Sequence, residues 1–222
     1  MSITLIITIL TCVISIHAFS NEKVMNDLIF YPPAISRRNQ WYRFISHGFI
    51  HADIAHLAFN MIGLYSFGGL IEKYMFTHPC IFGDNGNFIF IFMYLSSIAV
   101  ASLPTYFQQK DNYHYKSLGA SGAVSAVIFS GLVLMPQIPI NILFIPIDIP
   151  GYIFGPLFIG ISIYMSKKGQ DNINHSAHYW GAVYGFAFTL VLCLVLSKID
   201  VMENFVNQIK AYPNILMFNC EQ

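Results

Sequence analysis

Long runs of apolar residues, separated by short polar segments, dominate the pattern along the chain. Inside lipid a backbone must satisfy its own hydrogen bonds, and a helix needs about 20 mostly apolar residues to cross the hydrocarbon core. Several runs are apolar around the whole circumference of a helix, without the polar stripe of a surface helix. The pattern therefore predicts six transmembrane helices, the fifth of them short, at 2–19, 53–71, 88–107, 118–135, 152–165 and 177–196.

The segments between these runs are polar or broken by proline. The stretch 21–50 holds Pro32-Pro33 and many aromatic side chains, which is typical of a segment lying at the membrane interface. The stretch 136–151 contains four prolines and is predicted to be extended, and 167–176 is predicted to be a polar loop. No Lys or Arg precedes Lys23 and no A-x-A site follows the first run, so we expect a retained span rather than a cleaved signal peptide.

Composition also favours a membrane protein. Of the 222 residues, 55% are hydrophobic and 10% are charged, against about 25% charged in a typical soluble domain. Lys plus Arg and Asp plus Glu number 11 each, which gives no indication of a nucleic-acid partner. No composition shift divides the chain, so we expect one membrane domain over 1–222. The cysteines contain no C-x-x-C pair and predict neither a zinc site nor a disulfide framework: Cys12, Cys80, Cys193 and Cys220.

Polar side chains inside membrane helices are costly, so each is a candidate functional residue. Three clusters lie near the starts of the second, fourth and sixth predicted spans. They are His56 with Asn60, Ser121 between Gly119 and Gly122, and His178 followed by Gly181 and Gly185. Because alternate spans run in the same direction, the three clusters are expected at one depth, roughly 5–10 Å below one membrane surface.

This arrangement predicts a nucleophile and a base. Serine is a weak nucleophile until a base removes its proton, and a neutral histidine can do so near pH 7. The small residues of the fourth and sixth spans allow close helix approach, so Ser121 and His178 could come within hydrogen-bond reach. Neither span contains a carboxylate, so a Ser–His dyad is predicted rather than a triad. His56 and Asn60, on one face of the second span, could form an oxyanion hole with the backbone N–H of Ser121.

In these residues the chain resembles the rhomboid intramembrane serine proteases. Four motifs stand in the order of that family between about 41 and 185, and each alone would be a weak signal. They are W-x-R at Trp41 and Arg43, H-x-x-x-N at His56 and Asn60, G-x-S-G at 119–122, and A-H-x-x-G-x-x-x-G at 177–185. The residues Gly68, Gly69 and Glu72 follow the second motif as the family pattern implies.

The resemblance implies an all-α, six-helix rhomboid-like bundle with the catalytic serine at the foot of a water-filled cavity. It implies substrates that are single membrane spans, cleaved near a small residue in a locally unwound segment, and neither a metal nor a cofactor. The fifth span and the loop 167–176 are the candidate substrate gate on the family's pattern. One departure is Ser125, where some family members carry a tyrosine that stacks on the base, so the ring of His178 needs other support.

Membrane orientation is predicted differently by charge and by family. Eight cations fall on the side of the three polar clusters: Lys23, Arg37, Arg38, Arg43, Lys110, Lys116, Lys167 and Lys168. The other side has only Lys73, Lys198 and Lys210, and the positive-inside rule would place the first group in the cytoplasm. We follow the resemblance, which implies a multi-pass protein whose cavity opens to the extracytoplasmic side, and we expect a bacterial inner membrane from the size and family form.

Each candidate residue also has a structural interpretation. Ser121 and His178 could be helix-packing residues, and His56 and Asn60 could tie the second span to its neighbours. His47 and His51 are expected to share a helical face and, with His56, suggest a metal site. No H-E-x-x-H is present, however, and hydrogen bonding is the expected role.

Arg43 and Glu72 are expected to anchor a loop and a span end, and His175 is expected in a loop near the cavity mouth. Two other functions stay open. One is a non-catalytic rhomboid relative that binds and steers client membrane segments. The other is a small transporter or channel lined by histidines, which would require polar residues through the whole bundle.

Overall fold

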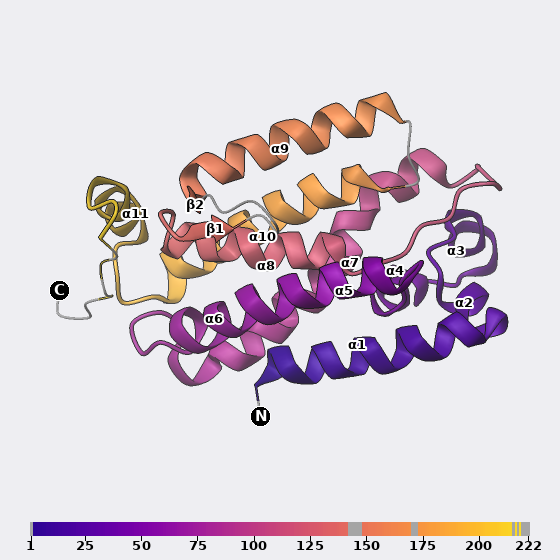
Figure 1. The fold of residues 1–222 in the computed structure, drawn as a ribbon, viewed down its shortest axis with the longest axis horizontal. Coiled ribbons are helices and arrows are strands. Elements are labelled where there is room, and N and C mark those ends of the chain that lie inside the picture. The colour runs from indigo at the N-terminus through magenta and orange to yellow at the C-terminus, as the bar shows by residue number, and fades with distance from the viewer. Residues whose placement is uncertain (1, 142–147, 170–172, 215, 217, 219–222) are drawn as a thin grey trace.

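A computed structural model describes residues 2–141, 148–169, 173–214, 216 and 218. The chain folds into a bundle of long, roughly aligned helices with a two-stranded antiparallel hairpin and a short helix at one end (Figure 1). The long helices are α1 (Ile3–Ser20), α5 to η3 (Ile54–Gly63, Leu64–Gly68, Gly69–Ile71 and Glu72–Phe76), α7 (Gly86–Gln109), α8 (Ser121–Leu134), α9 (Gly151–Lys168) and α10 (His175–Leu196). The shorter elements are α2 (Glu22–Leu28), α3 (Pro32–Arg38), α4 (Arg43–Ser46), η1 (His47–Phe49), η4 (Gly83–Asn85), β1 (Pro139–Asn141), β2 (Asp148–Pro150) and α11 (Val201–Lys210).

The expected all-α, polytopic membrane class is confirmed. In the described chain, four helical segments are long and apolar enough to cross a membrane: 3–20, 54–76, 83–109 and 175–196. The second of these includes two π-helical stretches and ends five residues beyond the predicted 71. The fifth predicted span, 152–165, lies within the longer helix α9, which continues to Lys168.

Helix α8 is the short central helix of the bundle. It has 14 residues, and at about 1.5 Å per residue it is roughly 21 Å long, shorter than the ~30 Å hydrocarbon core. Most of its side chains are buried, because α7, α9, α10 and the second span surround it. A helix shielded from lipid on all sides does not need to reach both surfaces, so its first residue, Ser121, can begin below the membrane surface.

Helices α8 and α10 approach each other through glycine. A Cβ on Gly181 would overlap the carbonyl oxygen of Gly122, and a Cβ on Gly185 would overlap the carbonyl oxygen of Ala126. On the other helix, a Cβ on Gly122 would lie 3.0 Å from the Cβ of Ala101 and 3.2 Å from the carbonyl oxygen of Ala177. The two backbones can therefore approach this closely because glycine has no side chain, as in other closely packed membrane helices.

Glu72 fixes the start of α1 against the second span. Its buried carboxylate accepts hydrogen bonds from the backbone N–H groups of Ile3 and Thr4, both at 2.7 Å, and from the hydroxyl of Thr4 at 2.6 Å. The first amides of a helix lack partners within the helix and carry a partial positive charge, so a carboxylate is the favoured acceptor there. Glu72 therefore contacts a helix end, as its position in the sequence suggested.

The connection between α1 and α5 forms the short helices α2, α3, α4 and η1. The buried guanidinium of Arg43 holds it together, donating to the carbonyls of Asn26 at 2.8 Å and Ile29 at 2.7 Å and to the side chain of Gln40 at 2.7 Å. Trp41 is largely exposed and stacks on Phe44, with ring centroids 6.0 Å apart. This packing suits a segment that contacts apolar groups on one side and water on the other.

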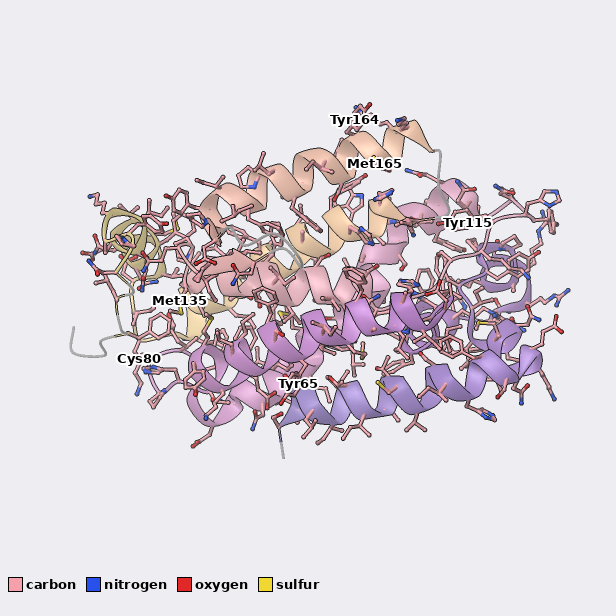
Figure 2. All side chains as sticks on the ribbon, viewed as in Figure 1. Tyr65, Cys80, Tyr115, Met135, Tyr164 and Met165 are labelled. Atoms are coloured by element: carbon pink, nitrogen blue, oxygen red, sulfur yellow. The ribbon has the colours of Figure 1, made fainter. Side chains whose placement is uncertain are left out.

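Three details differ from the sequence predictions. Helix α11 was not anticipated, and α10 begins at His175 rather than 177 because the side chain of Asn174 caps it by accepting from the N–H of Ala177. Cys80 is disulfide-bonded, which the scattered cysteines, read as no disulfide framework, did not predict. Figure 2 places Cys80 and Met135 toward the α11 end of the bundle and Tyr115 toward the opposite end.

Replacing Gly181 or Gly185 with alanine should push α10 away from α8. Each new methyl group would meet a backbone carbonyl, which cannot rotate away, so we expect a loss of about 1–3 kcal/mol in the free energy of unfolding. Unfolding in mixed micelles measures the effect. Gly160→Ala on α9 is the control, because a Cβ there has no heavy atom within 4 Å. Equal stability of Gly181→Ala and Gly160→Ala would contradict the glycine contact.

Candidate active site

Ser121 and His178 meet where α8 and α10 begin. The hydroxyl oxygen of Ser121 lies 2.7 Å from Nε2 of His178, a hydrogen-bond distance. Ser121 is the first residue of α8 and His178 lies in the first turn of α10, so both project from helix starts at the same end of the bundle. Both side chains are partly buried. The geometry is that of a serine hydroxyl with an adjacent base.

A cavity of about 850 Å³ opens over this pair. His56 and Asn60 line it together with Ser121 and His178, so the three polar clusters of the sequence meet in one place. Apolar side chains make up much of the remaining lining, among them Phe59 of α5 and Phe158 of α9, and Asp53 and Lys116 also border the cavity. A cleft with apolar walls and a few convergent polar groups is typical of a ligand-binding site.

The backbone just before Ser121 is held by the loop 47–51. The N–H of Gly119 donates to the carbonyl of His47 at 3.0 Å, and the N–H of Ala120 donates to Nε2 of His51 at 3.3 Å. Because that nitrogen accepts, the proton of the neutral ring is on Nδ1, which lies 2.9 Å from the hydroxyl of Ser15 in α1. That hydroxyl donates in turn to the carbonyl of Phe49. A chain of hydrogen bonds thus runs from α1 to the residue before Ser121.

His56 stands against the backbone of Gly119. Gly119 has φ of +114°, and a Cβ there would lie 2.7 Å from Cε1 and 2.8 Å from Nε2 of the ring, so both the backbone angle and the space favour glycine. Asp53 caps α5 by accepting from the N–H of His56 at 2.8 Å, which fixes that first turn. Nδ1 of His56 accepts a long contact from the N–H of Ala52 at 3.5 Å, which assigns the ring proton to Nε2, the nitrogen beside Gly119.

Asn60 lies one turn beyond His56 on the same face of α5. Its side-chain nitrogen donates to the carbonyl of His56 at 3.0 Å, and an amide nitrogen carries a second N–H. The N–H of Ser121 belongs to the first turn of α8, where amides have no partner within the helix. Donors from α5 and α8 therefore border the same cavity.

The ring of His178 is supported by residues that the sequence did not indicate. Phe158 of α9 stacks on it, with centroids 6.5 Å apart and planes at 28°, and His175 packs edge-on at 5.6 Å. Ser125 instead donates to the carbonyl of Ser121 at 2.8 Å. An aromatic residue supplied by another helix leaves no signal in the spacing around Ser121. His175, expected in a loop, is the first residue of α10.

His47 and His51 do not share a helical face. Helix η1 ends at Phe49, so His51 lies beyond it, and the two rings point to different helices. Nε2 of His47 lies 3.1 Å from the hydroxyl of Ser102 in α7, whereas His51 is bonded to Ser15 in α1. Within the residues that the structure describes, no group of three His, Cys, Asp or Glu side chains could hold a metal ion.

The fold and this site define a helical membrane protein with a Ser–His pair beneath an open cavity. Comparison with known proteins identifies the family: a family model described as the rhomboid domain matches residues 38–195. The chain therefore belongs to the rhomboid family, and the resemblance found in its motifs is confirmed.

Similar proteins come from bacteria and from plant organelles. The chain is 27% identical over 191 residues to "Rhomboid protease GlpG" of Haemophilus influenzae, covering 85% of this chain and 90% of the relative. It is 29% identical over 171 residues to "RHOMBOID-like protein 12, mitochondrial" of Arabidopsis thaliana, covering 75% of this chain and 50% of the relative. It is 28% identical over 157 residues to "Rhomboid protease GluP" of Bacillus subtilis, covering 67% of this chain and 25% of the relative. The matched region thus spans half or less of two of these relatives.

Acid should destabilise the loop that holds the site. Burial lowers the pKa of His47 to about 4, and burial with the neighbouring His56 lowers the pKa of His51 to about 3. The unfolded chain, with pKa values near 6.5, therefore binds protons that the folded chain does not, and stability present above pH 6.5 is lost as pH falls toward 4. We expect each of the two histidines to lower the free energy of unfolding by on the order of 1–3 kcal/mol between pH 7 and 4.5.

Denaturant titrations in detergent at several pH values measure this loss. His51→Gln, which removes one of the two groups, should be less stable at neutral pH but show a shallower pH dependence. His114→Gln is the control, because His114 lies on an exposed loop. Identical pH slopes for the wild type and His51→Gln would count against a buried neutral His51.

Proposed function

We propose that this chain is an intramembrane serine endopeptidase that cleaves transmembrane segments of other membrane proteins with a Ser121–His178 dyad. The observation that carries the proposal is the 2.7 Å contact between the Ser121 hydroxyl and Nε2 of His178, formed across two helices at the floor of a cavity. Membership of a family with relatives named as rhomboid proteases supports the same chemistry.

The chemistry follows from these atoms. His178 takes the proton of Ser121 as the hydroxyl oxygen attacks the carbonyl carbon of the substrate. The tetrahedral oxyanion accepts hydrogen bonds from Nε2–H of His56, the side chain of Asn60 and the N–H of Ser121. His178 then gives the proton to the departing amine, the C–N bond breaks, and the acyl group remains on Ser121. Water, deprotonated by His178, hydrolyses that ester and restores the hydroxyl.

The form of the cavity favours an apolar, extended substrate. Phe59 from α5 and Phe158 from α9 border it, so its sides suit the side chains of a membrane span. A peptide bond inside an intact helix is shielded by its neighbours, so the segment must unwind to reach Ser121. Helix α9 is the proposed side of entry, because it supplies Phe158 and precedes the connection 169–174, of which 170–172 lie outside the described residues. The predicted loop 167–176 is thus shorter, because α9 runs to Lys168 and α10 begins at His175.

The other two functions gain less support. A non-catalytic relative that binds client segments would not need the serine and histidine within hydrogen-bond reach. A histidine-lined channel would need polar residues along the whole bundle, whereas His56, Asn60, Ser121 and His178 gather at one cavity. The chain is a multi-pass membrane protein; its placement in a bacterial inner membrane, with the cavity opening outward, stays a prediction.

Loss of either dyad member should abolish cleavage. We expect Ser121→Ala and His178→Ala to cleave a single-span model substrate at least about 10³-fold more slowly than the wild type in proteoliposomes, because each removes the activated nucleophile. A fluorophosphonate probe should label the wild type and not Ser121→Ala. The control is Ser130→Ala, which removes a buried serine of the same helix that donates to Val127.

Cleavage by Ser121→Ala at the wild-type rate would overturn the dyad. A folded wild type that neither cleaves nor reacts with the probe, yet retains the substrate, would support the client-binding alternative instead.

The oxyanion donors should affect turnover more than binding. We expect His56→Ala and Asn60→Ala each to lower kcat by about 10²-fold with little change in KM, because the donors act on charge that develops only in the transition state. The control is Ile62→Ala, an exposed apolar residue of the same helix α5. A rise in KM with kcat unchanged would assign His56 and Asn60 to substrate binding and not to the oxyanion.

A further inference from the structure

Helix α11 (Val201–Lys210) lies at the end of the bundle opposite α2 and α3 (Figure 1). Its ten residues divide into three sectors around the helix axis. One sector, with Val201 and Gln208 fully buried, faces the bundle. The second is apolar and outward-facing, with Met202 54% and Val206 44% exposed and Ile209 beside them. The third is polar and exposed, with Glu203, Asn207 and Lys210.

Side-chain hydrogen bonds, together with the buried Val201, attach α11 to the bundle. The side chain of Asn204 donates to the carbonyl of Leu134 at 2.9 Å, satisfying one of the last carbonyls of α8. The buried side chain of Gln208 accepts from that of Gln137, and its nitrogen donates to the carbonyl of Leu216 at 2.8 Å. The side chain of Gln137 also donates to the carbonyl of Asn214 at 2.9 Å. These bonds fix the rotation of α11 about its axis.

The rotation of α11 about its axis turns polar side chains toward the bundle and apolar side chains outward, the reverse of a helix in a soluble protein. A helix on a water-soluble core turns its apolar stripe inward and its polar side chains outward. Here Asn204 and Gln208 face the bundle, whereas Met202 and Val206 face away. With the polar network fixing this orientation, the described residues leave the apolar sector exposed, and an apolar environment around the protein would cover it.

The apolar sector continues a surface that already faces lipid. Exposed Val191, Leu194 and Val195 lie on the last turns of the spanning helix α10, and Phe186 of α10 contacts Phe205 of α11 with ring centroids 6.5 Å apart. Only residues 197–200 separate the two helices, a link of at most about 14 Å. The start of α11 is thus held close to the end of α10, where a spanning helix is expected to leave the membrane.

We propose that α11 is an interfacial helix, with its Met202, Val206 and Ile209 sector in the lipid at the membrane surface and its Glu203, Asn207 and Lys210 sector in water. The two outward sectors adjoin, as expected for a helix lying along the boundary between acyl chains and headgroups. The partner is the bilayer itself, and the inference is independent of the proposed protease activity.

Single tryptophans test the placement. Met202→Trp and Val206→Trp probe the apolar sector, and Asn207→Trp is the matched control in the polar sector. The signal of each variant is its fluorescence minus that of the parent protein, which contains Trp41 and Trp180. The full chain is reconstituted in phosphatidylcholine vesicles with or without lipid brominated near the headgroup end of its acyl chains. Brominated lipid should quench the added fluorescence of the first two variants at least about twofold more than that of Asn207→Trp, and aqueous iodide should show the opposite order.

Two other outcomes would overturn the proposal. Equal lipid quenching of all three variants would show that α11 has no distinct lipid-facing side, and stronger iodide quenching of Met202→Trp than of Asn207→Trp would place the apolar sector in water. Protection of Met202→Trp and Val206→Trp from both quenchers, together with a dimer-sized particle in detergent, would show that a second copy of the chain covers the sector. The quenching does not require cleavage, so failure of the protease assignment and failure of this one are distinguishable.

Discussion

The close approach of α8 and α10 is the contact on which the rest of the site depends. Two helices that carried ordinary side chains at Gly181 and Gly185 would lie farther apart, because the backbone carbonyls of α8 occupy the space that a Cβ would take. In lipid no hydrophobic force drives apolar helices together, so close packing itself supplies much of the attraction. Ser121 and His178 come within 2.7 Å because this packing brings the starts of both helices together.

The start of α8 contributes more than a hydroxyl. A helix N-terminus presents amides without partners in the helix and a partial positive charge, which suits an oxyanion. Here the two preceding amides are bound by His47 and His51, so the backbone leading to Ser121 is fixed before any substrate arrives. The shortness of α8 allows this helix end to lie below the membrane surface. Placement of Ser121 and preorganisation of its surroundings thus have one structural origin.

At the opposite end of the bundle, polar side chains attach the terminal helices α1 and α11. Glu72 binds the first amides of α1, and Asn204 and Gln208 bind α11 to the end of α8. In a low-dielectric environment such groups are costly unless paired, which makes each pairing specific in position and rotation. In a membrane protein, apolar side chains cover both the core and the lipid-facing surface. Apolar side chains therefore do not determine which face of a terminal helix packs on the bundle, and these polar contacts do.

The sequence by itself determined the membrane class, the helical spans to within a few residues at most ends, and four of the polar residues that line the cavity. It could do so because lipid demands long apolar helices and makes polar residues such as Ser121, His178, His56 and Asn60 conspicuous. Only the tertiary structure decided the support of His178 by Phe158, the divergence of His47 and His51, and the rotation of α11. These depend on contacts between segments far apart in the chain, and an apolar or polar pattern along one segment carries no information about its partner.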